Sequence, residues 1–104
     1  MQPLSGVRVL DLSRILAGPH ATQTLSDLGA EVLKLEAPWG DDTRSWGPPF
    51  QSGFDGEEVA SYFLSCNRCK RIETVNIKQE QAHLRTLVAE FDIVVENFKP
   101  GTFD

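Results

Sequence analysis

Residues 7–36, VRVLDLSRILAGPHATQTLSDLGAEVLKLE, constrain the fold of this chain more than any other stretch. Residues 7–12 form a short, mostly apolar run rich in β-branched side chains, which is typical of a buried strand. Residues 31–36 read as a second short strand, and Gly29 before them is a favoured residue just past a helix end. The pattern predicts a strand, a helix and a second strand, the repeating unit of an open α/β sheet.

The helix between these strands is expected to begin near Gly18 and Pro19, because proline is favoured at the first helical position. It should run to about residue 28. Ala21, Leu25 and Leu28 are spaced to share one face, and we expect this face to pack on the sheet.

The loop at residues 13–19 is the first candidate site, because ligands in open α/β sheets bind beyond the carboxyl ends of the strands. The Gly-Pro pair is equally compatible with a simple tight turn. Glu36 ends the second strand, where a dinucleotide-binding fold places the acid that holds a ribose hydroxyl. The turn has one glycine and lacks the full G-x-G-x-x-G, so Glu36 could equally be a solvated strand end.

A long segment at residues 37–56 is dense in Gly, Pro, Asp and aromatic residues. Loops of this length inside a compact domain are usually functional or disordered. Trp39, Trp46 and Phe50 favour an ordered loop, because they supply apolar anchors that flexible linkers lack.

Two charged clusters could bind an anion or could be ordinary surface. In the first, Arg44 could reach a carboxylate or phosphate, or join a local network with Asp41 and Asp42. The second is the most basic spot in the chain, with three cations in four residues: Arg68, Lys70 and Arg71.

The remaining elements continue the alternation of helices and strands. We expect a short helix at residues 57–65, strands at residues 71–77 and 92–96, and a helix between these two strands. The last helix has the clearest pattern, with apolar residues at i, i+3, i+4 and i+7: Leu84, Leu87, Val88 and Phe91. The fold class is therefore α/β, an open and mostly parallel sheet with flanking helices, with no closing helix after the fourth strand.

Cys66 and Cys69 match C-x-x-C, a spacing found in zinc and redox sites. A structural zinc site needs four ligands, and the sequence offers neither a second cysteine pair nor histidines at ligand spacing. A redox dithiol normally opens a helix after a strand, whereas this pair precedes a strand. We expect two ordinary reduced cysteines and no metal site. We also expect His83, which lies next to the apolar stripe of the last helix, to be a histidine on the surface of that helix.

The composition limits the classes of partner that the chain could bind. A net charge of −5 argues against a nucleic-acid binder, which needs a broad basic face. No apolar run approaches the length of a membrane span. The N-terminus has neither the basic region nor the apolar region of a secretory signal. We expect no membrane partner, and a location in the cytoplasm or the mitochondrial matrix.

Several linked motifs resemble the class III CoA-transferase family, which includes formyl-CoA and carnitine CoA-transferases and a succinyl-CoA:dicarboxylate branch. The similar segments occur in order over nearly the whole chain: PLSGVRVLDLSRILAGPHATQTLSDLGAEVLKLEAP, GDDTRSWGPPF, YFLSCNRCKR, VNIK and DIVVENFKPG. The GDDTRSWGPPF loop looks most like the dicarboxylate-using transferases. The related 2-methylacyl-CoA racemases generally have a shorter segment there.

The resemblance implies that residues 1–104 are the N-terminal segment of a large, Rossmann-like domain whose crevice holds coenzyme A. CoA would be a substrate, with no tightly bound cofactor. The complete subunits would be several times longer and form interlocked homodimers. By position, the implied CoA contacts are Leu16, Ala17, Val75, Asn76, Ile77, Lys78, Asn97, Phe98 and Lys99. Lys99 is the expected phosphate partner by charge.

The sequence also departs from the family pattern. Ala37 stands where relatives often carry an arginine beside the nucleotide, and Arg68 with Cys69 alters a stretch that commonly reads V-N-R-N-K. The family's catalytic aspartate, which attacks the acyl-CoA thioester, would lie beyond Asp104.

Three functional hypotheses follow. The first is that the chain is the CoA-binding part of a CoA-transferase, with succinyl-CoA and a dicarboxylate as the expected substrates. The isolated 104-residue segment is expected to be inactive. The second is a non-catalytic CoA- or nucleotide-binding module. The third is the racemase branch, against which the long aromatic loop argues.

Overall fold

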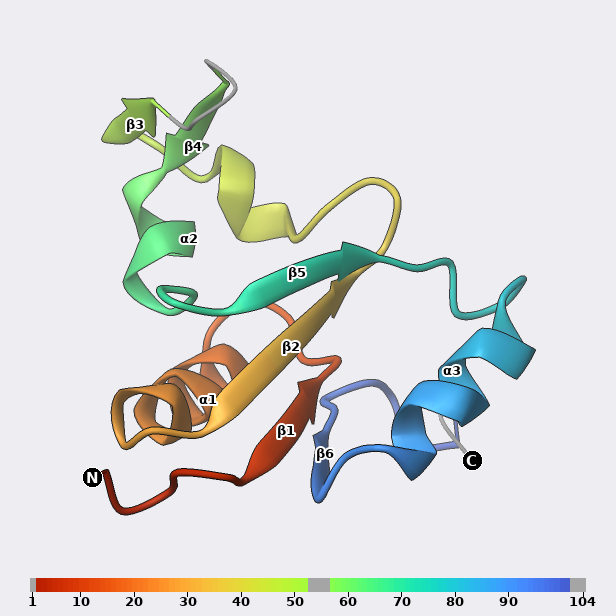
Figure 1. The fold of residues 1–104 in the computed structure, drawn as a ribbon. Coiled ribbons are helices and arrows are strands. Elements are labelled where there is room, and N and C mark those ends of the chain that lie inside the picture. Colours follow the sequence, from red (N-terminus) through yellow and green to blue (C-terminus); the bar gives the residue numbers. More distant parts are fainter. Residues whose placement is uncertain (1, 53–56, 102–104) are drawn as a thin grey trace.

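Four parallel strands form the main sheet of the protein. The computed structural model describes residues 2–52 and 57–101. The strands are β1 (Arg8–Asp11), β2 (Glu31–Glu36), β5 (Arg71–Thr74) and β6 (Ile93–Val95), and their order in the sheet is β5-β2-β1-β6. All three neighbouring pairs are parallel, so every carboxyl end lies at the same edge (Figure 1). The fold is the α/β sheet that the sequence predicts.

Two helices cover opposite faces of this sheet. Helix α1 (Ala17–Asp27) connects β1 to β2, and α3 (Gln81–Ala89) connects β5 to β6. Leu84 and Leu87 of α3 pack with Leu10 and Leu33 in the larger core cluster. A smaller cluster on the α1 side contains Val9, Ala30 and Val32. The apolar stripe predicted for α3 is confirmed, since Val88 and Phe91 are partly buried against the same core.

The α1-facing side of the sheet changes character along the strands. In β1, apolar Val9 is followed two residues later by Asp11, and in β2, Val32 is followed by Lys34 and then Glu36. Residues two apart in a strand share a face, so the charged groups gather near the carboxyl ends. All of these side chains are buried. Buried charges must be paired, and this requirement organises the site described below.

The buried face of α1 is the predicted one only at Leu25, which packs against the smaller core cluster. Ala21 and Leu28 are exposed and Leu25 is only half-buried. The helix instead buries Pro19, Thr22 and Gln23. Thr22 faces the charged end of the sheet, where its hydroxyl donates a hydrogen bond of 2.6 Å to Oδ2 of Asp11. Helix α1 is therefore oriented by polar contacts as well as by apolar packing.

Residues 37–52 and 57–65 form a small second unit, and the described part of the predicted loop at residues 37–56 contains regular elements. The unit contains a 3₁₀ helix, η1 (Asp42–Ser45), an antiparallel pair of strands, β3 (Phe50–Ser52) and β4 (Glu58–Ala60), and a short helix, α2 (Ser61–Ser65). Figure 1 shows this unit beyond the β5 side of the sheet. The helix predicted at residues 57–65 is thus partly wrong, because its first half is strand β4. Residues 53–56 of the predicted loop lie outside the described part.

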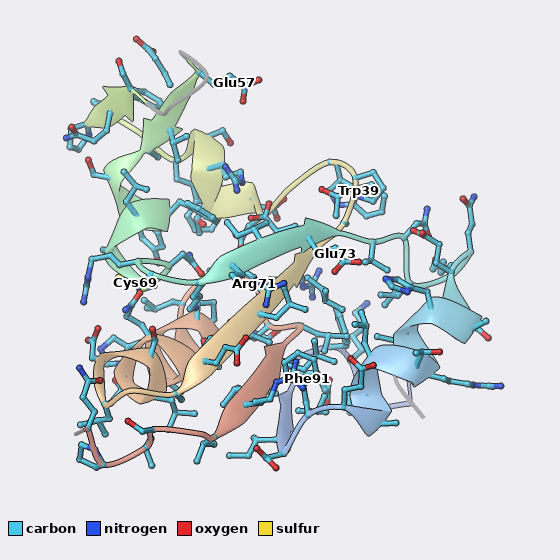
Figure 2. The ribbon with its side chains drawn as sticks, viewed as in Figure 1. Trp39, Glu57, Cys69, Arg71, Glu73 and Phe91 are labelled. Carbon is cyan, nitrogen blue, oxygen red and sulfur yellow. The ribbon has the colours of Figure 1, made fainter. Side chains whose placement is uncertain are left out.

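The aromatic residues of this segment are poor anchors. Trp39 is 79% exposed and points away from the ribbon in Figure 2, and Trp46 and Phe50 are also exposed. Trp46 makes one ring contact, edge-on to Tyr62 at 5.4 Å between centroids. Buried Thr43 and Phe63 anchor this region instead. None of the helices that the structure describes has the length and apolar character needed to cross a bilayer.

Candidate functional site

A cavity of about 470 Å³ lies at the carboxyl ends of the parallel strands. Its walls come from the residues after β1, β2 and β5, and from Phe98 after β6. Its size is within the range typical of small-molecule sites, about 300–1,000 Å³. Branched aliphatic side chains contribute to its lining: Leu12, Leu35, Val75 and Ile77. The cavity is where ligands bind in folds of this architecture.

The structure brings together only part of the sequence-predicted site. Five of the nine residues line the cavity: Val75, Asn76, Ile77, Lys78 and Phe98. Leu16 and Ala17 form the start of α1, with Leu16 half-exposed, and neither lines the cavity. Asn97 and Lys99 flank Phe98 but do not line it either. Ala37, the position of the missing family arginine, is part of the wall.

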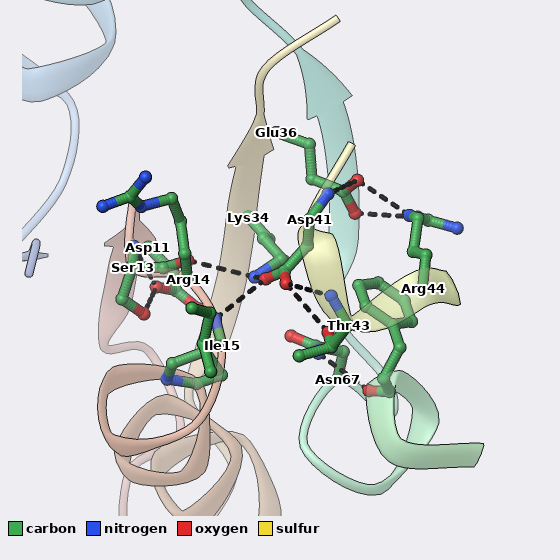
Figure 3. A network of polar contacts seen from close by, with 12 residues as sticks. Asp11, Ser13, Arg14, Ile15, Lys34, Glu36, Asp41, Thr43, Arg44 and Asn67 are labelled. Carbon is green, nitrogen blue, oxygen red and sulfur yellow. Dashed lines mark hydrogen bonds and ion pairs between the residues drawn. The ribbon is translucent and has the colours of Figure 1, made fainter. Parts of the chain in front are cut away.

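Asp41 connects the loops after β1 and β2 beside the cavity (Figure 3). Its Oδ2 lies 3.2 Å from Nζ of Lys34 and accepts a bond of 3.2 Å from the backbone N–H of Ile15. Its Oδ1 accepts two bonds from Thr43, one from the backbone and one from the hydroxyl. Burial alone would raise the pKa of Asp41, but the bonds from Thr43 and the charge of Lys34 lower it overall. Asp41 is therefore a buried, ionised structural group.

Glu36 is buried and paired, so its interpretation as a solvated strand end is wrong. Its carboxylate receives two bonds from the guanidinium of Arg44, at 2.8 and 2.7 Å, and a third from the backbone N–H of Asp41. Hydrogen bonding to Glu36 raises the pKa of Arg44. The guanidinium also lies 4.1 Å from the ring centroid of Phe63. Arg44 thus belongs to a local network, and the Nε and Nη2 edge of its guanidinium is taken up by Glu36.

Lys70 forms the second buried ion pair on the α1 side. Its Nζ lies 3.1 Å from Oδ2 of Asp11 and donates further bonds to the carbonyl of Pro19 and Oδ1 of Asn67. Asp11 also accepts bonds from the backbone and hydroxyl of Ser13. Burial lowers the pKa of Lys70, although the charge of Asp11 opposes this effect.

The basic cluster around Lys70 is therefore not an anion site. Arg68 pairs with Asp27 and Arg71 with Glu31, each at 3.2 Å. Together with the Lys70 pair, every cation of the cluster already has an acidic partner. The acids come from α1, β1 and β2, far away in sequence, which is why local composition indicated free positive charge.

Two cations that form no ion pair with a described acid line the cavity. Six of the ten Lys and Arg residues form ion pairs with described acids. The four that form none within the described residues are Arg14, Lys78, Arg85 and Lys99. Arg14 and Lys78 line the cavity, and the acid there that forms no ion pair with a described residue is Asp42. Sequence reasoning missed Arg14, although its place in the loop after β1 was a signal.

The cysteines and histidines contribute no site in the described part of the chain. Cys66 is buried, Cys69 is exposed, and both thiols are free. Nε2 of His83 lies 2.6 Å from Oε1 of Glu73 on the surface, consistent with the predicted surface histidine. The residues at 2–52 and 57–101 include no group of three or more His, Cys, Asp or Glu side chains that could hold a metal ion.

Comparison with known proteins gives consistent matches. The family model described as CoA-transferase family III matches residues 4–104. A succinyl-CoA:glutarate CoA-transferase of Mus musculus is 54% identical over 104 residues, covering 97% of this chain and 23% of that protein. A succinate–glutarate CoA-transferase of Agrobacterium fabrum is 52% identical, covering 93% of this chain and 25% of that protein.

The structural match is equally close. A crystal structure of a CAIB/BAIF family protein from Brucella suis superposes with a TM-score of 0.94 at 54% identity. The match covers 99% of this chain and 28% of that one. The chain spans about a quarter of the length of the curated relatives it matches.

Proposed function

Because the chain belongs to CoA-transferase family III, we propose that it is the N-terminal, CoA-binding part of an enzyme that moves coenzyme A between carboxylic acids. The expected donor is succinyl-CoA and the expected acceptor a dicarboxylate. The names of the similar proteins support this choice, since two are succinate–glutarate transferases and a third, from Haloarcula marismortui, is a succinyl-CoA:mesaconate CoA-transferase.

The observation that carries the proposal is the cavity itself. Coenzyme A combines a flat base and a flexible, partly apolar arm with several phosphate charges. The cavity offers the matching surfaces, because apolar Val75 and Ile77 lie on the same wall as Lys78, and Arg14 stands on another. The expected contacts at residues 75–78 and at Phe98 are part of this lining. Leu16, Ala17, Asn97 and Lys99 are proposed to contact CoA at the rim.

We propose that none of the described aspartates is the nucleophile that attacks the thioester. Asp42 is exposed and lines the cavity without an ion pair to a described residue, but it does not match the position of the family's aspartate. Asp11 and Asp41 are buried and hold hydrogen bonds on both carboxylate oxygens. Asp27 pairs with Arg68, and Asp92 accepts a backbone bond from Arg8. The resemblance places the catalytic carboxylate beyond residue 104, and we propose that the 104-residue chain alone is inactive. CoA would be a substrate rather than a resident cofactor, and the complete enzyme an interlocked homodimer.

Two experiments test the proposal. The first incubates the 104-residue chain with succinyl-CoA and glutarate and follows glutaryl-CoA by mass spectrometry, with no transfer expected. Transfer by this chain alone would overturn the assignment of the nucleophile. The second titrates CoA by calorimetry, with weak binding expected because residues 75–78 and 97–99 supply only part of the contacts. Tight binding of NAD with no heat of binding from CoA would overturn the assignment of CoA as the ligand.

The size of the native protein separates a transferase part from a non-catalytic module. The intact mass of the endogenous protein should exceed that of these 104 residues severalfold if they serve a complete transferase. A native mass equal to that of the chain would favour a binding module that performs no transfer.

A further inference from the structure

Arg14 is held in place more firmly than an exposed arginine usually is. Its backbone N–H donates a bond of 3.0 Å to Oδ1 of Asn97, and its carbonyl accepts one of 2.9 Å from Nδ2 of the same amide. One side chain, following β6, therefore fixes both backbone polar groups of a residue following β1. This contact extends the β1–β6 pairing past the last paired residues, Asp11 and Val95.

The side chain of Arg14 is supported as well. Its guanidinium carbon lies 5.1 Å from the ring centroid of Phe98, a cation–π distance. Figure 3 shows the guanidinium directed away from the Lys34–Asp41 pair. No hydrogen bond or ion pair within the described residues uses the guanidinium N–H groups of Arg14, and the residue lines the cavity. A planar fork of donors, fixed in position and without an acidic partner, is suited to bind an oxyanion.

We propose that Arg14 is an oxyanion-binding residue of the cavity and that Asn97 positions it. This assigns Asn97 a positioning role in addition to the rim contact proposed for it, because both ends of its amide hold Arg14. The ligand group is a phosphate or a carboxylate, which present the same oxygen geometry to a guanidinium. The inference rests on the proposed function only for the identity of the molecule that carries this group.

Four probes distinguish the possible sources of the anion. They are CoA, pantetheine, which has the arm but no phosphate, inorganic pyrophosphate and glutarate. Each is titrated into the 104-residue protein while amide chemical shifts are recorded by NMR, which detects weak binding. The variant is Arg14→Gln. The matched control is Arg85→Gln, because Arg85 is also exposed and forms no ion pair within the described residues but lies on α3, outside the cavity lining.

We expect Arg14→Gln to weaken the binding of an anionic probe about tenfold, since one charge-assisted contact typically contributes that much. If CoA and pyrophosphate bind more weakly and the binding of pantetheine is unchanged, the bound group is a phosphate. If glutarate binds more weakly, the bound group is a carboxylate. If Arg14→Gln behaves like Arg85→Gln with every probe, the proposal is wrong. Pyrophosphate binding through Arg14 without any CoA binding would refute the proposed function but keep this inference.

A double-mutant cycle tests the positioning role of Asn97. Asn97→Ala should weaken the binding of the same probe as Arg14→Gln does, and should have no further effect when Arg14 is already Gln. An equal loss in both backgrounds would mean that Asn97 acts independently, and would overturn its assigned role. Thermal melting of each variant checks that the fold is intact.

Discussion

Lys70 and Asp11 meet inside the protein although 59 positions separate them in sequence, with Nζ 3.1 Å from Oδ2. Neither side chain is exposed to solvent. The pair joins the residue before β5 to the end of β1, and Thr22 of α1 completes the contact. It therefore links α1, β1 and the start of β5 at one point.

Removing Lys70 should be strongly destabilising. Lys70→Met leaves Asp11 as a buried carboxylate without its cation, and breaking a buried pair in this way costs about 3–5 kcal/mol. Arg71→Met is the matched control, because it removes the neighbouring cation from a pair in which both partners are largely exposed. That change should cost less than about 1 kcal/mol. Urea unfolding measures both, and equal costs would show that burial does not strengthen the Lys70 contact.

Asp41 should make the protein sensitive to acid. Its pKa in the folded state is lowered by the bonds from Thr43 and the charge of Lys34, against the opposing effect of burial. A lowered folded-state pKa stabilises the fold above the ordinary aspartate pKa of about 3.9, and this stabilisation is lost as the pH falls through the folded value. The free energy of unfolding should therefore fall below about pH 4.

Asp41→Asn should flatten that part of the pH profile and lower stability at pH 6. Asp42→Asn controls for the loss of one negative charge, since Asp42 is exposed and adjacent. Urea unfolding at several pH values between 2 and 7 gives the comparison. A profile unchanged by Asp41→Asn would assign the acid sensitivity to other carboxylates.

The orientation of α1 can be checked by comparing a substitution of a buried polar residue with a substitution of an exposed apolar one. Thr22→Val keeps the shape of a buried side chain but removes a hydrogen bond to Asp11, which should cost about 1–3 kcal/mol. Leu28→Gln replaces a large apolar residue that is 42% exposed and should change stability by less than about 0.5 kcal/mol. Thermal melting that finds the leucine change more damaging would contradict the observed helix orientation.

Trp39 should report on occupancy of the cavity. It lines the cavity and is largely exposed, so a bound base would change its surroundings. In the Trp46→Phe variant, which leaves Trp39 as the single tryptophan, CoA should alter the fluorescence. In Trp39→Phe the remaining Trp46 is outside the lining and should respond weakly. A larger response from Trp46 would place the ligand near α2 instead.

The elements that sequence reasoning predicted well are those with a simple apolar pattern. Strands β1 and β2 and helix α3 each place apolar residues on a buried face, and periodicity alone locates them. The buried face of helix α1 was predicted incorrectly because that face is partly polar. Thr22 and Gln23 are buried because they form hydrogen bonds with Asp11 and with the backbone of Arg68. Pattern-based inference assumes that buried means apolar, and that assumption fails beside buried charges.

The family resemblance, and not the strand pattern, pointed to residues 75–78. The sequence pattern placed most of them inside the third strand, but they follow β5 and do line the cavity. The charge state of the site could not be predicted, because it depends on which cations are already paired. The sequence left open whether Arg44 and the cluster around Lys70 bind an anion, and both cations are paired. Arg14 drew no attention and forms no ion pair within the described residues. Pairing across long sequence separations is a property of the fold.

The place of β6 beside β1 has a consequence for biosynthesis. Chains emerge from the ribosome N-terminus first, so β1, α1 and β2 are available long before residues 93–98. Asn97 and Phe98, which hold Arg14, are among the last described residues to appear. A nascent chain can therefore assemble much of the sheet while its cavity still lacks one wall. The cavity would gain this wall only when β6 docks beside β1.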